Sequence, residues 1–85
     1  MTEQKMLILY GTSWCGATRR ARQTLDAHGI QYTYVDIDSD MEGRAFVETT
    51  NHGFRSVPTL LFPNGSTLTE PTTIELEDAI AKLLR

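Results

Sequence analysis

The stretch Gly11–Arg20, GTSWCGATRR, contains the only cysteine of the chain, Cys15. Three residues later, where a Cys-x-x-Cys redox motif would have its second cysteine, the chain has Thr18. We expect Cys15 to lie just beyond a buried strand, at the start of a helix. Helix N-termini carry unpaired N–H groups and partial positive charge, which stabilise the nucleophilic thiolate form of cysteine. A lone cysteine is more often a buried packing residue, but this polar, glycine-flanked setting favours a reactive thiol.

The residues around Cys15 suit nucleophilic chemistry. Gly16 leaves room for another chain to approach the sulfur, and Trp14 is placed to shield one side of it. Thr18, one turn into the helix, is expected to donate a hydrogen bond to the sulfur without competing as a nucleophile. Positive potential is expected from the arginines in the next two turns, which are Arg19, Arg20 and Arg22.

A second signal lies far along the chain, where Pro58 directly precedes a strand-like run. An X–Pro bond can be cis, and we expect a cis bond between Val57 and Pro58. This bond would turn the Val57 N–H and C=O groups outward, where they could pair with an extended peptide as an added strand. Arg55 precedes this segment, either as a ligand for a carboxylate or as a solvated surface arginine.

Strand and helix signals alternate along the whole chain. Apolar runs with β-branched and aromatic residues predict strands, and apolar side chains at four-residue spacing predict helices. The order is βαβ followed by αββα, with a right-handed crossover in the first unit. We therefore predict an α/β fold with a four-stranded mixed sheet flanked by helices, in a single domain over residues 1–85. The predicted strands are 5–10, 30–37, 58–62 and 66–69, and the predicted helices are 15–28, 39–53 and 72–84.

Caps and turns are predicted from shorter patterns. The segments Ser39–Glu42 and Thr72–Glu75 have the spacing of capping boxes, and Asn64–Gly65 suits a type I′ hairpin turn. The second helix is expected to carry an apolar face of Met41, Ala45, Phe46 and Thr49. The last helix is expected to bury Leu76, Ala79, Ile80, Leu83 and Leu84.

Composition excludes several classes of function. The net charge of −3 argues against general nucleic-acid binding, which requires a basic surface. No apolar run approaches a membrane span or a secretory leader. A single cysteine cannot form an internal disulfide, and small secreted domains usually need disulfides, so we expect a cytoplasmic protein. We expect no metal site and no membrane partner.

Four segments, TSWCGAT, VDID, SVPT and PNGS, together resemble the glutaredoxin branch of the thioredoxin fold over nearly the whole chain. Within that branch they are most similar to the short, mycoredoxin-like glutaredoxins of bacteria. The resemblance implies a thioredoxin-like βαβαββα fold. It also implies a thiol–disulfide oxidoreductase that reduces mixed disulfides between proteins and a low-molecular-weight thiol, in electron transport and cell redox homeostasis.

The resemblance also implies roles for individual residues. Cys15 matches the nucleophile, and Val57 and Pro58 match the element whose backbone pairs with the cysteine of a bound small thiol. Thr67 and Thr69 lie near the place where many glutaredoxins have a Gly-Gly and an Asp that hold the glutamyl end of glutathione. That pattern is missing here. We expect glutathione, mycothiol or bacillithiol as the co-substrate, with the missing pattern counting against glutathione, and we expect no permanently bound cofactor.

Thr18 leaves three hypotheses open. The first is a monomeric oxidoreductase that works through Cys15 alone and passes through a mixed disulfide with the small thiol. The second is an iron–sulfur cluster carrier, because CGAT is close to the CGFS motif of monothiol glutaredoxins, with two subunits and two small thiols supplying the ligands. The third is a non-catalytic thiol-binding or redox-sensing module in which Cys15 is a modification site.

Overall fold

The computed structural model describes residues 6–84 of the chain; Lys5, included in the predicted first strand, lies outside them. The order of elements is the predicted one, βαβαββα. The strands and helices are β1 (Leu7–Gly11), α1 (Gly16–Ala27), β2 (Tyr32–Asp36), α2 (Met41–Thr50), β3 (Thr59–Leu61), β4 (Thr67–Thr69) and α3 (Thr73–Leu83).

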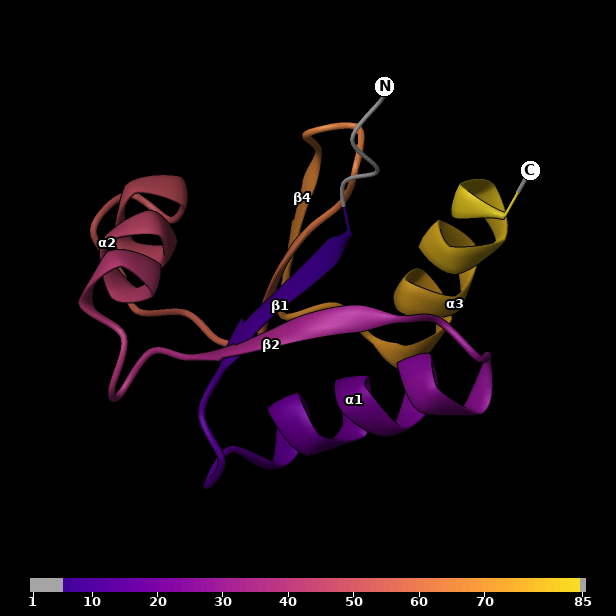
Figure 1. The fold of residues 1–85 in the computed structure, drawn as a ribbon, viewed down its shortest axis with the longest axis horizontal. Coiled ribbons are helices and arrows are strands. Elements are labelled where there is room, and N and C mark those ends of the chain that lie inside the picture. The colour runs from indigo at the N-terminus through magenta and orange to yellow at the C-terminus, as the bar shows by residue number, and fades with distance from the viewer. Residues whose placement is uncertain (1–5, 85) are drawn as a thin grey trace.

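The four strands form one mixed sheet in the order β2-β1-β3-β4 (Figure 1). β1 pairs in parallel with β2 and antiparallel with β3, and β3 pairs antiparallel with β4. The predicted four-stranded mixed sheet is therefore confirmed. Because β1 and β3 are the central neighbours, the loops that follow β1 and precede β3 meet at one end of the sheet.

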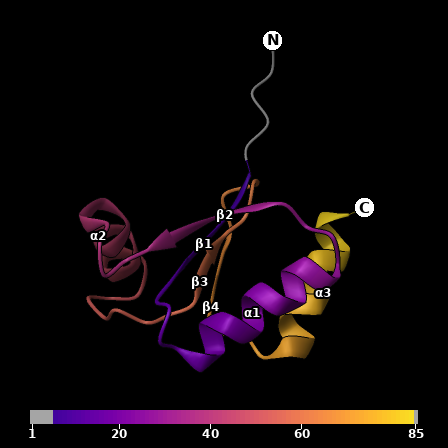
Figure 2. The ribbon, with the colours of Figure 1, turned by 60° about the horizontal axis from the view of Figure 1, so that its bottom comes forward.

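The helices cover both faces of the sheet (Figures 1 and 2). On one face, α1 and α3 pack side by side over Leu7, Leu9 and Leu60, and bury Leu25 and Ile80 against them. On the other face, α2 packs alone over a smaller cluster built from Tyr10, Ile37 and Val47. The alternation of β1 side chains between the two clusters follows from the two-residue period of a strand.

Helix α2 departs from the prediction in its cap and its buried face. Asp40, not Ser39, is the N-cap, and its carboxylate accepts a hydrogen bond of 2.9 Å from the Gly43 N–H. The buried residues are Gly43 and Val47, whereas the expected apolar face is exposed at Met41, Ala45 and Thr49 and half-buried at Phe46. The expected face was wrong because α2 approaches the sheet closely at Gly43, which has no side chain.

The other predicted caps and turns have mixed outcomes. The capping box of Thr72 and Glu75 is confirmed, with both hydrogen bonds present. The predicted type I′ turn is wrong, because it requires a positive φ at both Asn64 and Gly65, and of these two only Gly65 has one. The hairpin instead has a three-residue loop, residues 63–65, between the paired residues Phe62 and Ser66, and the Gly65 N–H donates to the Phe62 carbonyl. Leu84, expected in the core, is exposed because α3 ends at Leu83.

Gly11, the last residue of β1, lets the first turn of α1 pack directly on the strand. A Cβ at this position would lie 2.5 Å from Cγ2 and 2.7 Å from Oγ1 of Thr18. Thr18 is only 1% exposed and has no free space into which it could move. The glycine therefore sets the position of the helix start relative to the strand.

We predict that Gly11→Ala lowers the free energy of unfolding by about 1–3 kcal/mol, the usual cost of overpacking a core. Urea unfolding followed by circular dichroism measures this change as a lower midpoint. An unchanged midpoint would show that Thr18 is not held against β1.

Candidate functional site

Cys15 occupies the N-cap position of α1, as the sequence predicted. Its backbone is extended, its N–H donates to the Thr12 carbonyl at 3.3 Å, and its carbonyl accepts from the Arg19 N–H at 3.1 Å. These bonds fix the turn between β1 and the helix. The sulfur is thereby held at the positive end of α1, where the first N–H groups have no partner within the helix.

The pKa of the Cys15 thiol lies below its ordinary value because two opposing effects do not cancel. Partial burial alone would raise the pKa. Hydrogen bonds from the Thr18 hydroxyl and from the N–H groups of Thr18 and Ala17, together with the charge of Arg19, lower it by more. The site therefore favours a thiolate, the form that attacks a disulfide.

Thr18 is positioned to stabilise the sulfur in the way the sequence suggested. Its hydroxyl oxygen accepts a long hydrogen bond, 3.5 Å, from the Thr12 N–H. Because that bond uses an oxygen lone pair, the hydroxyl proton remains available for the Cys15 sulfur. Thr18 is buried beside Gly11, so this orientation is fixed by packing.

The segment before β3 meets the sulfur from the other side. The Val57–Pro58 bond is cis, and the Sγ of Cys15 lies 3.9 Å from the Val57 carbonyl oxygen. The Pro58 carbonyl accepts a 2.8 Å hydrogen bond from the Glu70 N–H, which ties the segment to the end of β4. The Val57 N–H donates to no acceptor within residues 6–84, so it is free to bind a ligand.

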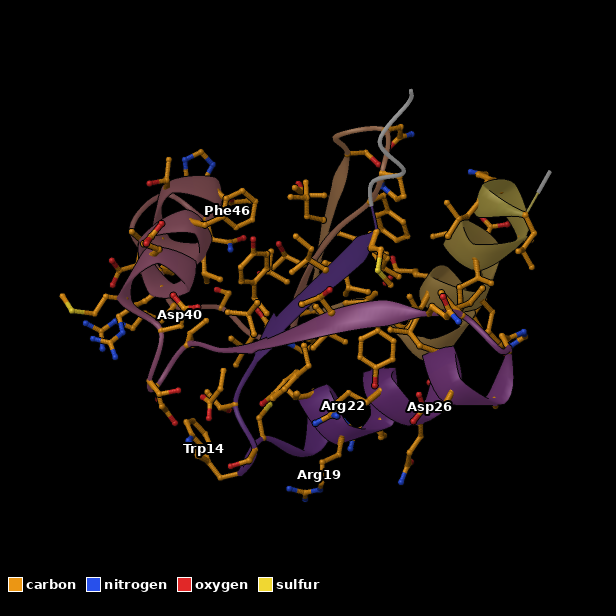
Figure 3. The ribbon with its side chains drawn as sticks, in the orientation of Figure 1. Trp14, Arg19, Arg22, Asp26, Asp40 and Phe46 are labelled. Atoms are coloured by element: carbon orange, nitrogen blue, oxygen red, sulfur yellow. The ribbon has the colours of Figure 1, made fainter. Side chains whose placement is uncertain are left out.

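Trp14 flanks Cys15 on the solvent side. Its indole N–H donates to the Asp38 carboxylate at 2.8 Å, which holds an otherwise exposed ring in place. Figure 3 shows Trp14 and Arg19 at the start of α1, with Arg22 further along the same helix. Arg22 donates to the Tyr32 hydroxyl and stacks over the Tyr34 ring at 4.1 Å, so its expected role at Cys15 is replaced by packing against β2.

Of the other residues predicted to bind the small thiol, some lie near Cys15 and others lie away from it. Gly16 directly follows Cys15, and a Cβ there would meet only the tips of arginine side chains. Arg55 is exposed and forms a 2.7 Å ion pair with Glu48. Thr69 donates to the Asn51 side chain at 2.8 Å, whereas Thr67 pairs with Leu61 at the hairpin end of β4, away from Cys15.

Sequence patterns did not identify Asn51 as part of this region, and they assigned no role to Asp38 beyond its membership of the VDID segment. Each is a polar residue next to a helix end, and such residues are usually caps or solvated turns. Their contacts with Thr69 and Trp14 join segments that are far apart in the chain. Only the folded arrangement reveals these contacts.

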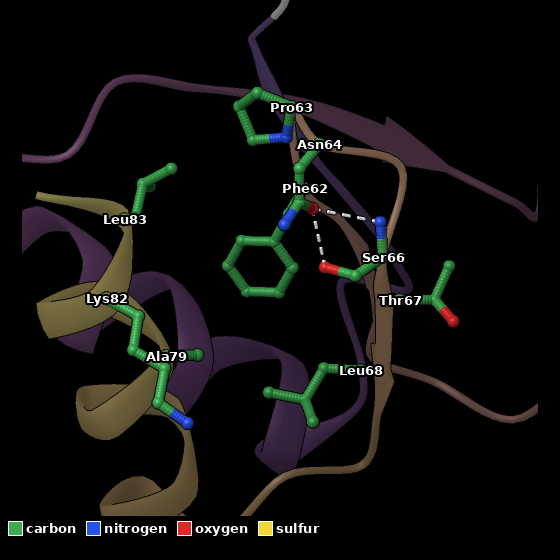
Figure 4. A pocket seen from close by; sticks show the side chains of 9 residues that line it. All are labelled: Phe62, Pro63, Asn64, Ser66, Thr67, Leu68, Ala79, Lys82 and Leu83. Carbon is green, nitrogen blue, oxygen red and sulfur yellow. Dashed lines mark hydrogen bonds between the residues drawn. The ribbon is translucent and has the colours of Figure 1, made fainter. Parts of the chain in front are cut away.

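Two of the clefts that border helix α3 lie at its opposite ends. One, of about 290 Å³, lies between α1 and the start of α3 and is lined by Ala17, Arg20, Glu70 and Thr72 among others. Ala17 is two residues from Cys15 in the chain, and Cys15 itself does not line this cleft. The other, of about 380 Å³, is formed by the hairpin and the far end of α3 (Figure 4), and is remote from Cys15.

No cluster of three or more His, Cys, Asp or Glu side chains suited to a metal ion occurs in residues 6–84. Across the same residues, no helix is both long and apolar enough to cross a membrane.

Comparisons with known proteins identify the family. The family model named Glutaredoxin matches residues 7–66, which include both Cys15 and the cis-proline segment. This chain belongs to the glutaredoxin family. Glutaredoxins are thiol–disulfide oxidoreductases that use glutathione-like thiols as co-substrates, and the single cysteine of this glutaredoxin fits a monothiol function.

Individual relatives agree with this glutaredoxin assignment. A Mycobacterium tuberculosis protein assigned to the glutaredoxins is 42% identical over 91% of this chain and 92% of its own. Mycoredoxin 1 of Corynebacterium glutamicum is 36% identical over 91% of both chains.

Solved structures share the fold. The holo form of poplar glutaredoxin C1 has a TM-score of 0.67 at 24% identity, covering 92% of this chain and 77% of that one. A buckwheat glutaredoxin–glutathione complex has a TM-score of 0.68 at 21% identity, covering 92% of this chain and 72% of that one. At these identities the likeness concerns the fold alone.

We predict that Thr18→Val raises the pKa of Cys15 by about one unit, because a hydrogen bond to a charged group is worth about that much. The pH dependence of alkylation by iodoacetamide measures this pKa. Thr18→Ser keeps the hydroxyl and is the matched control, with a midpoint close to that of the wild type. Equal midpoints in the valine variant and the wild type would contradict the role of the hydroxyl.

Proposed function

We propose that this glutaredoxin reduces mixed disulfides between proteins and a small thiol through Cys15 alone. One observation carries the proposal. The Cys15 sulfur lies between the donors at the start of α1 and the backbone carbonyl of the half-buried Val57, with Thr18 where a second cysteine would stand. A sulfur so placed can exchange with an external disulfide, and no internal disulfide is possible.

The proposed cycle has two exchanges. The Cys15 thiolate attacks the small-thiol sulfur of the mixed disulfide, the old S–S bond breaks, and the protein thiolate leaves and takes up a proton. Cys15 is then joined to the small thiol. A second small-thiol anion attacks the sulfur of the bound small thiol, so that a small-thiol disulfide leaves and the Cys15 thiolate is regenerated. Each cycle thus converts one mixed disulfide and one free small thiol into one protein thiol and one small-thiol disulfide, and the free small thiol is the reductant.

The site residues have distinct parts in this cycle. The Thr18 hydroxyl and the first N–H groups of α1 stabilise Cys15 both as nucleophile and as leaving group, because both steps place negative charge on its sulfur. The free Val57 N–H and its carbonyl are suited to pair with the cysteine backbone of the small thiol, as an added strand. The exposed ring of Trp14, held by Asp38 next to Cys15 in the chain, is placed to contact a bound substrate.

We further propose that the small thiol is neutral and rich in hydroxyl groups, as mycothiol is, rather than ending in carboxylates as glutathione does. The cleft beside Ala17 is lined by Glu70 as well as Arg20, so its lining carries no net positive charge. The N-terminus of α3 is already capped by Thr72 and Glu75, which removes donors that a carboxylate could use. The similarity to mycoredoxin 1 supports the same choice.

The proposed enzyme acts as a monomer, because the cycle needs one thiol from the protein. We place it in the cytoplasm, where small thiols keep a lone cysteine reduced.

We predict that Cys15→Ser abolishes reduction of a protein–mycothiol mixed disulfide, because the serine hydroxyl does not replace the thiolate. Thr18→Ala keeps the nucleophile and lowers the rate only modestly, about tenfold or less, through a weaker thiolate. Turnover assays measure both, and mass spectrometry should find one small-thiol adduct, located on Cys15. Full activity of Cys15→Ser would contradict the mechanism.

We predict that Glu70→Gln lowers the KM for glutathione by about two- to fivefold, because it removes a like charge from the cleft that would receive a carboxylate. The KM for mycothiol should stay unchanged. Glu42→Gln makes the same charge change on α2, across the sheet, and serves as the control. An unchanged glutathione KM in Glu70→Gln, or an equal fall in Glu42→Gln, would contradict the assignment of this cleft.

A further inference from the structure

A chain of polar contacts connects the end of α2 to the segment that faces Cys15. The Asn51 amide donates to the Val47 carbonyl at 2.9 Å and to the Thr59 hydroxyl at 3.1 Å. Its oxygen accepts from the Thr69 hydroxyl at 2.8 Å. The Thr59 hydroxyl in turn donates to the Ser56 carbonyl at 2.8 Å. One side chain thus links α2, β4 and β3.

The donor and the acceptor of each hydrogen bond in this series are fixed by the proton that Thr59 gives to Ser56. Thr59 gives its single proton to Ser56, so it must accept from Asn51. The Asn51 oxygen is then left to accept from Thr69. A carboxylate at position 51 has no proton for either Val47 or Thr59, and an apolar side chain has neither donor nor acceptor. The arrangement therefore requires an amide.

The series of hydrogen bonds ends at the Ser56 carbonyl, next to the backbone of Val57 that we propose binds the small thiol. Ser56 directly precedes Val57, whose carbonyl oxygen lies 3.9 Å from the Cys15 sulfur. Thr59 is fully buried and Pro58 is buried beside it, so the carbonyl of Ser56 has a rigid partner. Without the Thr59 proton, the Ser56 peptide would lose this internal anchor.

We propose that Asn51 is a positioning residue for small-thiol binding, acting through Thr59 and Ser56 on the Val57 backbone. This rests on the proposed function, because it assumes that Val57 pairs with the small thiol. Asn51 touches neither Cys15 nor the ligand. It holds the Val57 N–H and carbonyl in the orientation that an added strand requires, and its loss weakens binding more than chemistry.

Thr59→Val tests the link because it removes the hydroxyl and keeps the shape. We expect the KM for the small-thiol mixed disulfide to rise about five- to tenfold, the effect of one or two net hydrogen bonds. The kcat should stay within about twofold of the wild-type value, and the pKa of Cys15 should move by no more than about a few tenths of a unit. Both are expected because the hydrogen-bond donors to the sulfur lie on α1, not on β3. Thr59→Ser restores the hydroxyl and should restore the wild-type KM.

Two further variants separate positioning from folding. Thr69→Val removes the donor to the Asn51 oxygen and should raise the KM by a smaller factor. Ile80→Val weakens the core on α3, remote from this chain of contacts, and should leave the KM unchanged. The Val57 amide resonance, followed by NMR, should shift in Thr59→Val and Asn51→Ala but not in Ile80→Val.

The outcomes distinguish the two proposals. A wild-type protein with no turnover of any mixed disulfide overturns the proposed function. An active wild type with an unchanged KM in Thr59→Val overturns the positioning role alone. An equal rise in KM in Ile80→Val assigns the effect to general loss of stability and overturns the positioning role as well.

Discussion

The approach of the Cys15 sulfur to the Val57 carbonyl, 3.9 Å across 42 residues of sequence, is the contact on which the rest of the site depends. It exists because β1 and β3 are neighbours in the sheet, so that the loop after one and the segment before the other meet. Gly11 brings α1 close to β1, and the Asn51 contacts hold the segment before β3. The Gly11 contact fixes the helix start on one side of the Cys15 sulfur, and the Asn51 contacts fix the Val57 segment on the other.

The thiolate is stabilised by a small number of local donors. Burial opposes the charge, and the Thr18 hydroxyl, two N–H groups of α1 and Arg19 outweigh it. Hydrogen bonds weaken steeply as their length and angle depart from the ideal, so these donors stabilise the thiolate only if the start of α1 keeps its position relative to the Cys15 sulfur. A threonine in place of a second cysteine thus keeps a hydrogen-bond donor where a resolving thiol would otherwise be. In the proposed mechanism the site keeps the first exchange and depends on an external thiol for the second.

Sequence patterns predicted what depends on neighbours in the chain. The order of elements, the helix start at Cys15, the cis bond at Val57 and the Thr72 capping box all follow from short motifs. Patterns failed where tertiary packing decides: Gly43 is buried because α2 lies close to the sheet, and Leu84 is exposed because α3 ends before it. Asn51 could not be identified, because its partners lie in three separate segments.

The pairing of the small thiol with Val57 would be visible in a crystal structure of the protein joined to its small thiol through Cys15. We predict that the cysteine part of the small thiol lies antiparallel to the segment at Val57. Its backbone should accept from the Val57 N–H and donate to the Val57 carbonyl, with the remaining body of the thiol in the cleft beside Ala17 and Glu70. A small thiol that extends away from Val57 and makes no backbone pair with it would contradict the account.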